Sequence, residues 1–204
     1  MTRKIFILTA LVMMIFCVNA CAFSDVQSGS WYYDNVTDMT NQGYLSGYED
    51  GTFRPDGTVT KAELVSIVGR IAGLQESAKQ NNHWADGMVQ TALTKGLFDW
   101  DEIPPTAQTY DEPITRQLAV KIVMNAFFKE ERGDYNRVSS SVSDFAQLDG
   151  RYYDSMIAAY CKGIVYGDDN GNLNPKSSIT RAEACAIIMR AASMNCLLYT
   201  SDAA

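Results

Sequence analysis

The chain has 204 residues, with 24 acidic side chains, 17 basic side chains, a single His and a net charge of −7. An acidic chain has no bulk attraction for nucleic acid or for an anionic membrane, so an anionic ligand must be held by local cations. One His and no recognisable nucleophile motif give no basis for a metal site or a catalytic triad. We therefore expect no cofactor, no metal and no catalytic residues.

The N-terminal segment has the pattern of a secretory signal peptide. Two basic residues precede an uncharged apolar run at residues 5–18, and small residues follow. The pattern predicts that residues 1–22 are removed on export. The run is too short for a membrane-spanning helix, and we expect no transmembrane segment in the mature chain. An alternative is that residues 18–21 form a lipoprotein box, which would place a lipid anchor at Cys21.

An internal repeat organises the rest of the chain. Ten residues of the N-terminal part recur 120 positions later, and a weaker middle copy aligns at offsets of 53 and 55. Periodicity of this kind is typical of repeat folds. The three predicted copies are residues 23–74, residues 83–128, which are degenerate, and residues 142–195. We expect polar linkers at 75–82 and 129–141, with the second as a mobile hinge.

Each copy has the pattern of two helices joined by a loop. Gly residues that can end a helix in the left-handed conformation follow the predicted first helices, which are residues 34–42, 88–95 and 153–162. Second helices begin near Thr60, Thr115 and Thr180, with apolar residues at helical spacing. One pair of helices cannot bury its apolar stripe alone, so neighbouring copies must cover one another. The sequence therefore predicts an all-α fold of three lobes.

The second helices begin with capping boxes and an unexpected cation. Residues 60–63 and 180–183 each place Thr at the N-cap and Glu three positions later. Lys61, Arg116 and Arg181 occupy the first helical position, where the helix dipole disfavours a positive charge. A cation beside unpaired helix N–H groups suits a carboxylate or phosphate ligand. The alternative is that each cation pairs with a nearby Asp or Glu.

Aromatic residues recur just before the first helix of each copy. Trp31 and Trp84 are followed in the third copy by Tyr152 and Tyr153. Aromatic faces beside polar groups suit the stacking of sugar rings. The alternative is packing between lobes, which we expect of at least one Tyr in each copy.

The motifs resemble those of the S-layer homology domain family. The resemblance rests on residues 23–26, 47–55 and 59–63, and on their counterparts 142–145, 167–175 and 179–183. It implies three helix-loop-helix repeats in a pseudo-threefold spindle with a central three-helix bundle. It also implies a secreted protein at the cell wall, whose inter-lobe grooves bind an anionic cell-wall polysaccharide, often through a pyruvate ketal carboxylate. The ligand-binding residues it implies are Lys61, Arg116, Arg181, Asp25, Asp144, Trp31, Trp84, Gly51 and Gly171.

The middle copy departs from the family pattern. Residues 114–118 keep the cation Arg116 but lose the capping Glu, and the Ser-Asp start and the Gly-rich loop are missing. We therefore expect at most two fully competent grooves and a smaller role for Arg116.

Several other interpretations remain open at this point. The chain could be a self-assembling surface-layer protein, or the anchor of a longer exported hydrolase. Residues 196–204 have the pattern of a sequencing-adapter read-through. Residues 168–171 are interpreted as a turn, since the spacing of a calcium loop is absent. Cys161 and Cys185 are interpreted as two buried thiols, with a disulfide as the alternative.

Overall fold

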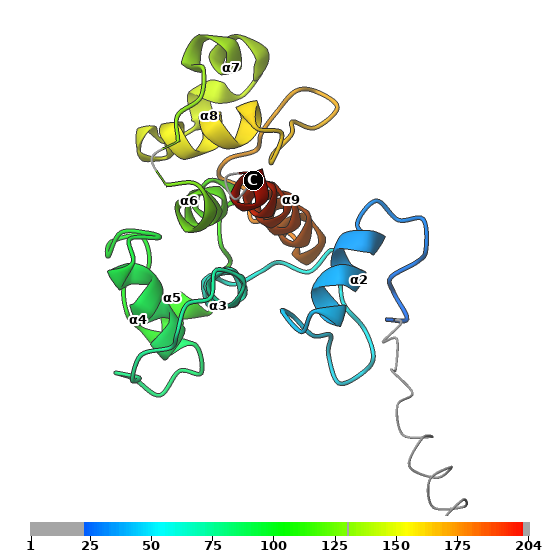
Figure 1. The fold of residues 1–204 in the computed structure, drawn as a ribbon, viewed down its shortest axis with the longest axis vertical. Coiled ribbons are helices and arrows are strands. Elements are labelled where there is room, and N and C mark those ends of the chain that lie inside the picture. The colour runs from blue at the N-terminus through cyan, green and yellow to red at the C-terminus, as the bar shows by residue number, and fades with distance from the viewer. Residues whose placement is uncertain (1–22, 130, 202–204) are drawn as a thin grey trace, which may run out of the picture.

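The computed structural model describes residues 23–129 and 131–201 (Figure 1). The predicted signal peptide at residues 1–22, and with it the alternative of a lipid anchor at Cys21, lie outside the described residues. The suspected adapter segment lies partly inside them, because its residues 196–201 continue the last helix.

The predicted first and second helices are all present. The first helices are α2 (Tyr33–Asn41), α4 (Asp86–Thr94) and α8 (Tyr153–Cys161), and the second helices are α3 (Lys61–Ile71), α6 (Arg116–Phe127) and α9 (Arg181–Ser201). Gly43, Gly96 and Gly163 follow the first helices with φ angles of 73°, 74° and 70°, so they end these helices as predicted. Shorter elements are α5 (Ala107–Tyr110), α7 (Tyr135–Ser141) and two 3₁₀ turns, Phe145–Gln147 and Gly150–Tyr152.

The three second helices pack together at the centre of the molecule, and the first helices surround them (Figure 1). Each first helix packs on the second helix of a different copy: α2 on α9, α4 on α3, and α8 on α6. The buried core therefore joins all three copies, with Leu64, Ile122 and Ile188 each 0–1% exposed. The all-α class is confirmed for the described residues, whereas the regular spindle shape stays a prediction.

A closed ring of backbone hydrogen bonds ties the copies together just before the second helices. Each apolar residue preceding an N-cap Thr donates to its counterpart in another copy. The three bonds are Val59 to Ile179 (3.1 Å), Ile179 to Ile114 (3.3 Å) and Ile114 to Val59 (3.0 Å). All three residues are buried, so these donors and acceptors satisfy one another away from water.

The described residues of both predicted linkers contact neighbouring helices. The sequence predicts a hinge at residues 129–141, but this segment contains α7, which packs on α8 and buries Val138 completely. Mobility of this segment stays a prediction, although Val138 docks the short helix α7 against α8. In the linker at 75–82, the backbone N–H groups of Gln80 and Asn81 donate to the carboxylate of Asp86, which is fully buried.

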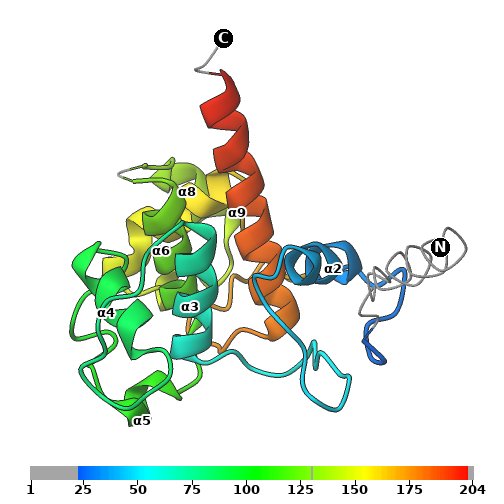
Figure 2. The ribbon, with the colours of Figure 1, turned by 60° about the horizontal axis from the view of Figure 1, so that its bottom comes forward.

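The last helix is longer than its counterparts and extends beyond the body of the molecule (Figure 2). Within residues 23–129 and 131–201, no helix is both long enough and apolar enough to cross a membrane. Cys161 and Cys185 are free, so the disulfide alternative is wrong. Cys185 is buried, as expected, and its burial raises the pKa of its thiol to about 12; Cys161 is only partly buried.

Candidate ligand-binding grooves

The first backbone N–H group of each second helix is already bonded to another copy. Each motif cation donates its N–H to a loop carbonyl three residues before the neighbouring N-cap. The bonds are Lys61 to Glu112 (2.9 Å), Arg116 to Ser177 (2.8 Å) and Arg181 to Gly57 (2.8 Å). The expectation of a ligand bound by unpaired helix N–H groups is therefore wrong for these three donors, because the copies cap one another.

The third N–H group of α3 and of α9 is also satisfied. The N-cap Thr oxygens accept from Glu63 and Glu183 at 3.2 Å, and both Glu carboxylates accept in return from the Thr N–H at 2.8 Å. Both predicted capping boxes are thus confirmed. Thr115 forms no side-chain cap, in keeping with the missing Glu in the middle copy.

Each motif cation pairs with an acid of another copy, which is the alternative that the sequence left open. Arg116 lies 3.1 Å from Glu183, Arg181 lies 3.5 Å from Glu63, and Lys61 lies 2.8 Å from Glu112. Two of the three acids are the capping Glu residues. A single carboxylate therefore caps its own helix and holds the guanidinium of its neighbour.

Arg181 is a structural residue in this arrangement. It is only 9% exposed, and its Nε donates to the Phe53 carbonyl at 2.9 Å while Nη2 donates to Ser46 at 3.1 Å. Its guanidinium carbon lies 5.0 Å from the Tyr48 ring centroid and 4.6 Å from that of Phe53. The guanidinium of Arg181 thus uses both its hydrogen-bond donors and its faces in contacts with the first copy.

Arg116 occupies the same place beside the third copy, but it is bound less completely. Its Nη2 donates to the Tyr166 carbonyl at 3.4 Å, the counterpart of the bond to Ser46. Its Nε is buried and has no acceptor among the described residues. Burial lowers the pKa of the Arg116 guanidinium, Glu183 opposes this, and the positive charge of Arg190 lowers the pKa further.

Arg116 borders an open groove whose floor is α9, which we call the α9 groove. It consists of two cavities of about 160 and 180 Å³, which share Arg116, Tyr166 and Glu183. Together they reach the lower end of the size range of small-molecule sites, roughly 300 Å³. Trp31 and Tyr166 form its aromatic walls, with exposures of 61% and 56%. The smaller cavity is lined by Trp31, Arg116, Tyr166, Glu183, Ala186, Ile187 and Arg190.

Each motif cation forms its ion pair with another copy and not with its own. The cation that has no complete Gly-rich loop beside it is therefore different from the one that the sequence predicts. Arg116 of the degenerate middle copy donates a hydrogen bond to the residue just before the complete Gly-rich loop of the third copy. Arg181 does the same at the Gly-rich loop of the first copy. Lys61 instead faces the middle copy, which lacks this loop. From the sequence, Arg116 is expected to have the smaller role in binding, because its own copy lacks the Gly-rich loop. In the structure, Lys61 is the motif cation that faces a copy without this loop.

Four of the remaining predicted site residues, two Asp and two Gly, stabilise the conformation of the Gly-rich loops. Asp25 accepts N–H bonds from Phe53 and Arg54 at 2.8 and 2.7 Å. Asp144 does the same for Leu173 and Asn174, both at 2.8 Å. Gly51 and Gly171 have φ angles of 79° and 77°, and their carbonyls accept from Ser24 and Ser143. Trp84, 50% exposed, is the counterpart of Trp31 in the middle copy.

The predicted turn at 168–171 is confirmed, with Asp168 at its centre. Its carboxylate accepts N–H bonds from Asn170 and Asn172, both at 2.9 Å, and a side-chain bond from Asn174 at 3.1 Å. These bonds lower the pKa of Asp168 to about 2. The described residues contain no cluster of three or more His, Cys, Asp or Glu suited to a metal ion.

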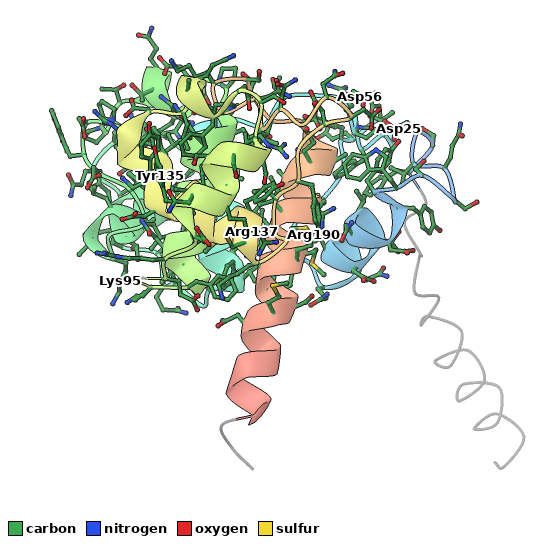
Figure 3. The ribbon with its side chains drawn as sticks, turned by 90° about the horizontal axis from the view of Figure 1, so that it is seen from above. Asp25, Asp56, Lys95, Tyr135, Arg137 and Arg190 are labelled. Atoms are coloured by element: carbon green, nitrogen blue, oxygen red, sulfur yellow. The ribbon has the colours of Figure 1, made fainter. Side chains whose placement is uncertain are left out.

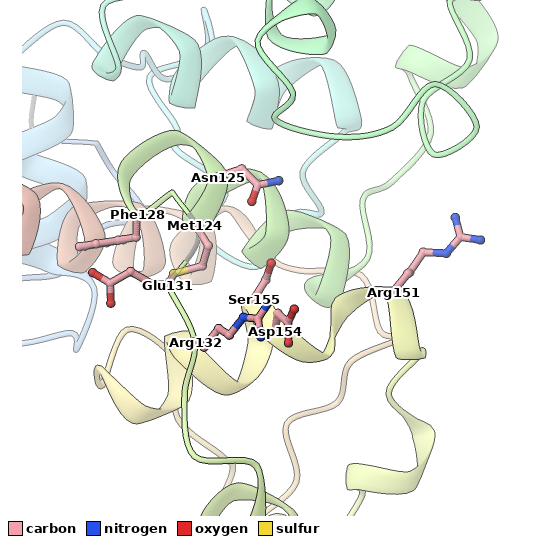
Figure 4. A pocket seen from close by; sticks show the side chains of 8 residues that line it. All are labelled: Met124, Asn125, Phe128, Glu131, Arg132, Arg151, Asp154 and Ser155. Carbon is pink, nitrogen blue, oxygen red and sulfur yellow. The ribbon is translucent and has the colours of Figure 1, made fainter.

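Another cavity, larger than those of the α9 groove, contains no predicted site residue. It has a volume of about 650 Å³ and lies between the end of α6 and the start of α8 (Figure 4). Its charges are partly paired, because Arg151 lies 3.0 Å from Asp101 and Glu131 lies 2.6 Å from Lys162. We therefore place the candidate site in the smaller α9 groove, where aromatic and cationic groups meet.

Two segments of the chain match a known domain family. Residues 22–65 and 143–185 match the S-layer homology domain. The chain is 30% identical over 183 residues to an endoglucanase of a Bacillus species, covering 83% of this chain and 18% of that enzyme. It is 25% identical over 162 residues to a cellulosome-anchoring protein of Acetivibrio thermocellus, covering 72% and 35%. It is 26% identical over 184 residues to the surface-layer 125 kDa protein of Lysinibacillus sphaericus, covering 84% and 15%. The chain thus spans at most about a third of the length of these relatives.

Proposed function

We propose that this chain, which carries S-layer homology domains, anchors an exported protein to the cell wall without a covalent bond. The ligand that we propose is an anionic cell-wall polysaccharide, such as one bearing a pyruvate ketal. The observation that carries the proposal is the α9 groove, where the exposed rings of Trp31 and Tyr166 stand beside the guanidinium groups of Arg116 and Arg190. The names of the relatives, a cellulosome-anchoring protein and surface-layer proteins, support attachment to a cell surface.

The chemistry of the groove fits an acidic glycan. Exposed aromatic faces give a sugar ring a flat apolar surface, and a guanidinium recognises a carboxylate through directed, charge-assisted hydrogen bonds. The carboxylate of Glu183 lies in the same groove and can accept a bond from a sugar hydroxyl group. A site with both kinds of partner suits a polymer that alternates neutral and acidic groups.

Catalysis does not fit the described residues as well. The side chain of the single His, His83, is buried. It pairs with Asp111 at 3.1 Å and packs against the Tyr110 ring. His83 is not among the residues that line the α9 groove. The endoglucanase and the amylopullulanase among the relatives extend far beyond the aligned part, which supports the interpretation of this chain as the anchor of a longer protein.

A self-assembling surface-layer protein is the second candidate, and the surface-layer relatives favour it. The two candidates differ in their partner. An anchor binds wall polysaccharide, whereas an assembly protein binds further copies of itself.

Binding to purified cell walls tests the proposal. Residues 23–195 should sediment with intact walls and should stay in solution with walls whose polysaccharide has been chemically removed. Trp31→Ala should weaken binding about tenfold or more, since one stacked aromatic contributes a kcal/mol or more. Trp100→Ala is the matched control, because Trp100 is 63% exposed and is not part of the α9 groove. Equal sedimentation with stripped walls would contradict the proposal.

A further inference from the structure

We propose that the acidic group of the ligand is bound by Arg190, and that Arg116 positions the groove without carrying the ionic contact. This inference rests on the proposed function and goes beyond it by assigning the charge recognition to a residue outside the helix-start motif. Arg190 lies on α9, nine residues after Arg181, and lines the same cavity as Trp31 and Tyr166.

The first argument is the state of the two guanidinium groups. Arg116 has one nitrogen on Glu183 and one on the Tyr166 carbonyl, and its third nitrogen is buried. Arg190 has only one hydrogen bond within the described residues, from Nη1 to the Ile164 carbonyl at 3.2 Å. No described carboxylate pairs with it. Its positive charge is therefore available, whereas that of Arg116 is balanced by Glu183.

The second argument is the position of Arg190 against aromatic surface. Its guanidinium carbon lies 4.8 Å from the ring centroid of Tyr166, so the ring supports the guanidinium plane from one side. The side chain is half-buried along α9, which limits the number of orientations that it can adopt. A guanidinium held in this way loses less conformational entropy when it binds a carboxylate.

The third argument is the internal repeat. Arg70 stands at the same position on α3, and α4, the helix that follows Trp84, packs on α3. On α6 the position is Asn125, and Arg151 stands where the other two copies have Trp. The second arginine and the tryptophan thus occur together in two faces and are absent together from the third. Joint retention fits a shared ligand better than two separate packing roles.

The fourth argument is the distribution of charge along the α9 groove. Arg190 lines the cavity that also contains Trp31, and Asp168 lines the other cavity. Asp168 repels an acidic substituent, while its own acceptor positions are filled by Asn170, Asn172 and Asn174. The ligand is therefore oriented, with its acidic group toward Arg190 and its neutral part toward Asp168.

Asparagine is the informative substitution because the repeat already contains it. Asn125 donates its side-chain N–H to the Leu97 carbonyl at 3.1 Å, the counterpart of the bond from Arg190 to Ile164. Arg190→Asn should therefore keep the structural bond and remove only the charge. A double variant with Arg70→Asn covers both equivalent faces. The charge-matched control is Lys95→Asn with Arg137→Asn; Figure 3 shows Lys95 and Arg190 on separate parts of the molecule, and Arg137 lies on α7.

The probe is the polysaccharide released from walls that bind the wild-type chain, used intact and after carbodiimide and borohydride reduction of its carboxyl groups to alcohols. Calorimetry should show that the wild type and the control double variant bind the reduced glycan at least tenfold more weakly. Arg70→Asn/Arg190→Asn should bind both glycans equally weakly, and Arg190→Lys should restore part of the preference. Arg116→Gln should weaken binding of both glycans by the same factor.

Two results would overturn the inference. One is an Arg70→Asn/Arg190→Asn variant that keeps the wild-type preference for the intact glycan, with a normal melting temperature. The other is an Arg116→Gln variant that loses the preference for the intact glycan, which would show that Arg116, the motif cation, binds the carboxylate of the ligand. If the wild type binds no wall polysaccharide at all, the proposed function fails, and the inference fails with it. If the wild type binds both glycans equally, only the inference fails.

Discussion

At the scale of single residues, the capping Glu residues have two duties that the sequence showed only in part. Glu183 caps α9 through Thr180 and holds Arg116 of another copy at 3.1 Å. The capping box was predictable because it is a local pattern of four residues. The ion pair was not, since it joins residues that are 67 positions apart.

The cap of α9 gives a prediction about stability. Thr180→Ala removes the oxygen that accepts the Glu183 N–H at 3.2 Å and should lower the free energy of unfolding by about 1 kcal/mol. Thr115→Ala is the matched control, because Thr115 is an N-cap residue without a side-chain cap bond, and it should cost less. Urea unfolding measures both. Equal losses would show that the hydrogen bond is not the source of the effect.

Arg181 gives a second prediction, which reverses an expectation from its sequence motif. Its side chain is 10% exposed, and its removal leaves the Phe53 and Ser46 carbonyls without their donor. Arg181→Ala should therefore lower the free energy of unfolding by about 1–3 kcal/mol. Arg70→Ala, at an exposed position of α3, should change it little. Normal stability together with lost binding would make Arg181 a ligand contact instead of a structural residue.

At the scale of elements, the Gly-rich loops are self-contained structures held by carboxylates. Asp168 binds three partners within its own loop, and Asp144 ties this loop to the start of the third copy. The sequence predicted the turn from its Asp, Asn and Gly residues. The family resemblance assigned Asp144 to the ligand, whereas the loop N–H groups that it accepts from account for this acid.

The loop should respond to acid in a defined range. The folded pKa of Asp168, about 2, lies below its ordinary value of 3.8, so the folded loop favours the ionised carboxylate. Its contribution is complete above about pH 4 and is lost as the pH falls through about 2. The protection of the Asn170 and Asn172 amides, measured as the ratio of the intrinsic to the observed exchange rate at each pH, should fall over this range. Asp168→Asn should make exchange fast already at about pH 6, while Asp169→Asn should leave it unchanged; an unchanged rate in Asp168→Asn would contradict the assignment.

At the scale of the whole molecule, the repeat predicted three mutually covering copies, and the helical class of the described residues is confirmed, whereas the number of repeats stays a prediction. The order in which the copies cover one another could not be derived, because the apolar stripe of α3 is equally suited to α2 or α4. In the structure α4 packs on α3 and α2 packs on α9, and the ring at Val59, Ile114 and Ile179 joins the three copies. The open groove was missed for the same reason: Trp31, Arg116 and Arg190 come from three copies.

Because each first helix packs on the second helix of another copy, we expect that no single copy folds alone. A fragment of residues 23–74 leaves α2 without α9 and α3 without both α4 and the other central helices. We expect it to be largely unfolded by circular dichroism, whereas residues 23–195 should unfold in one cooperative transition. Separate calorimetric transitions for the three copies would contradict this expectation.

The packing of the first helix on the last has a mechanical consequence. Because α2 rests on α9, a pull on the two ends of the described chain acts along one shared interface and not on a series of separate units. The hydrogen-bonded ring at the helix starts then opposes the load as a whole, since releasing one copy breaks bonds in both of its neighbours. Under tension the module should hold until a single high-force event, instead of lengthening stepwise copy by copy.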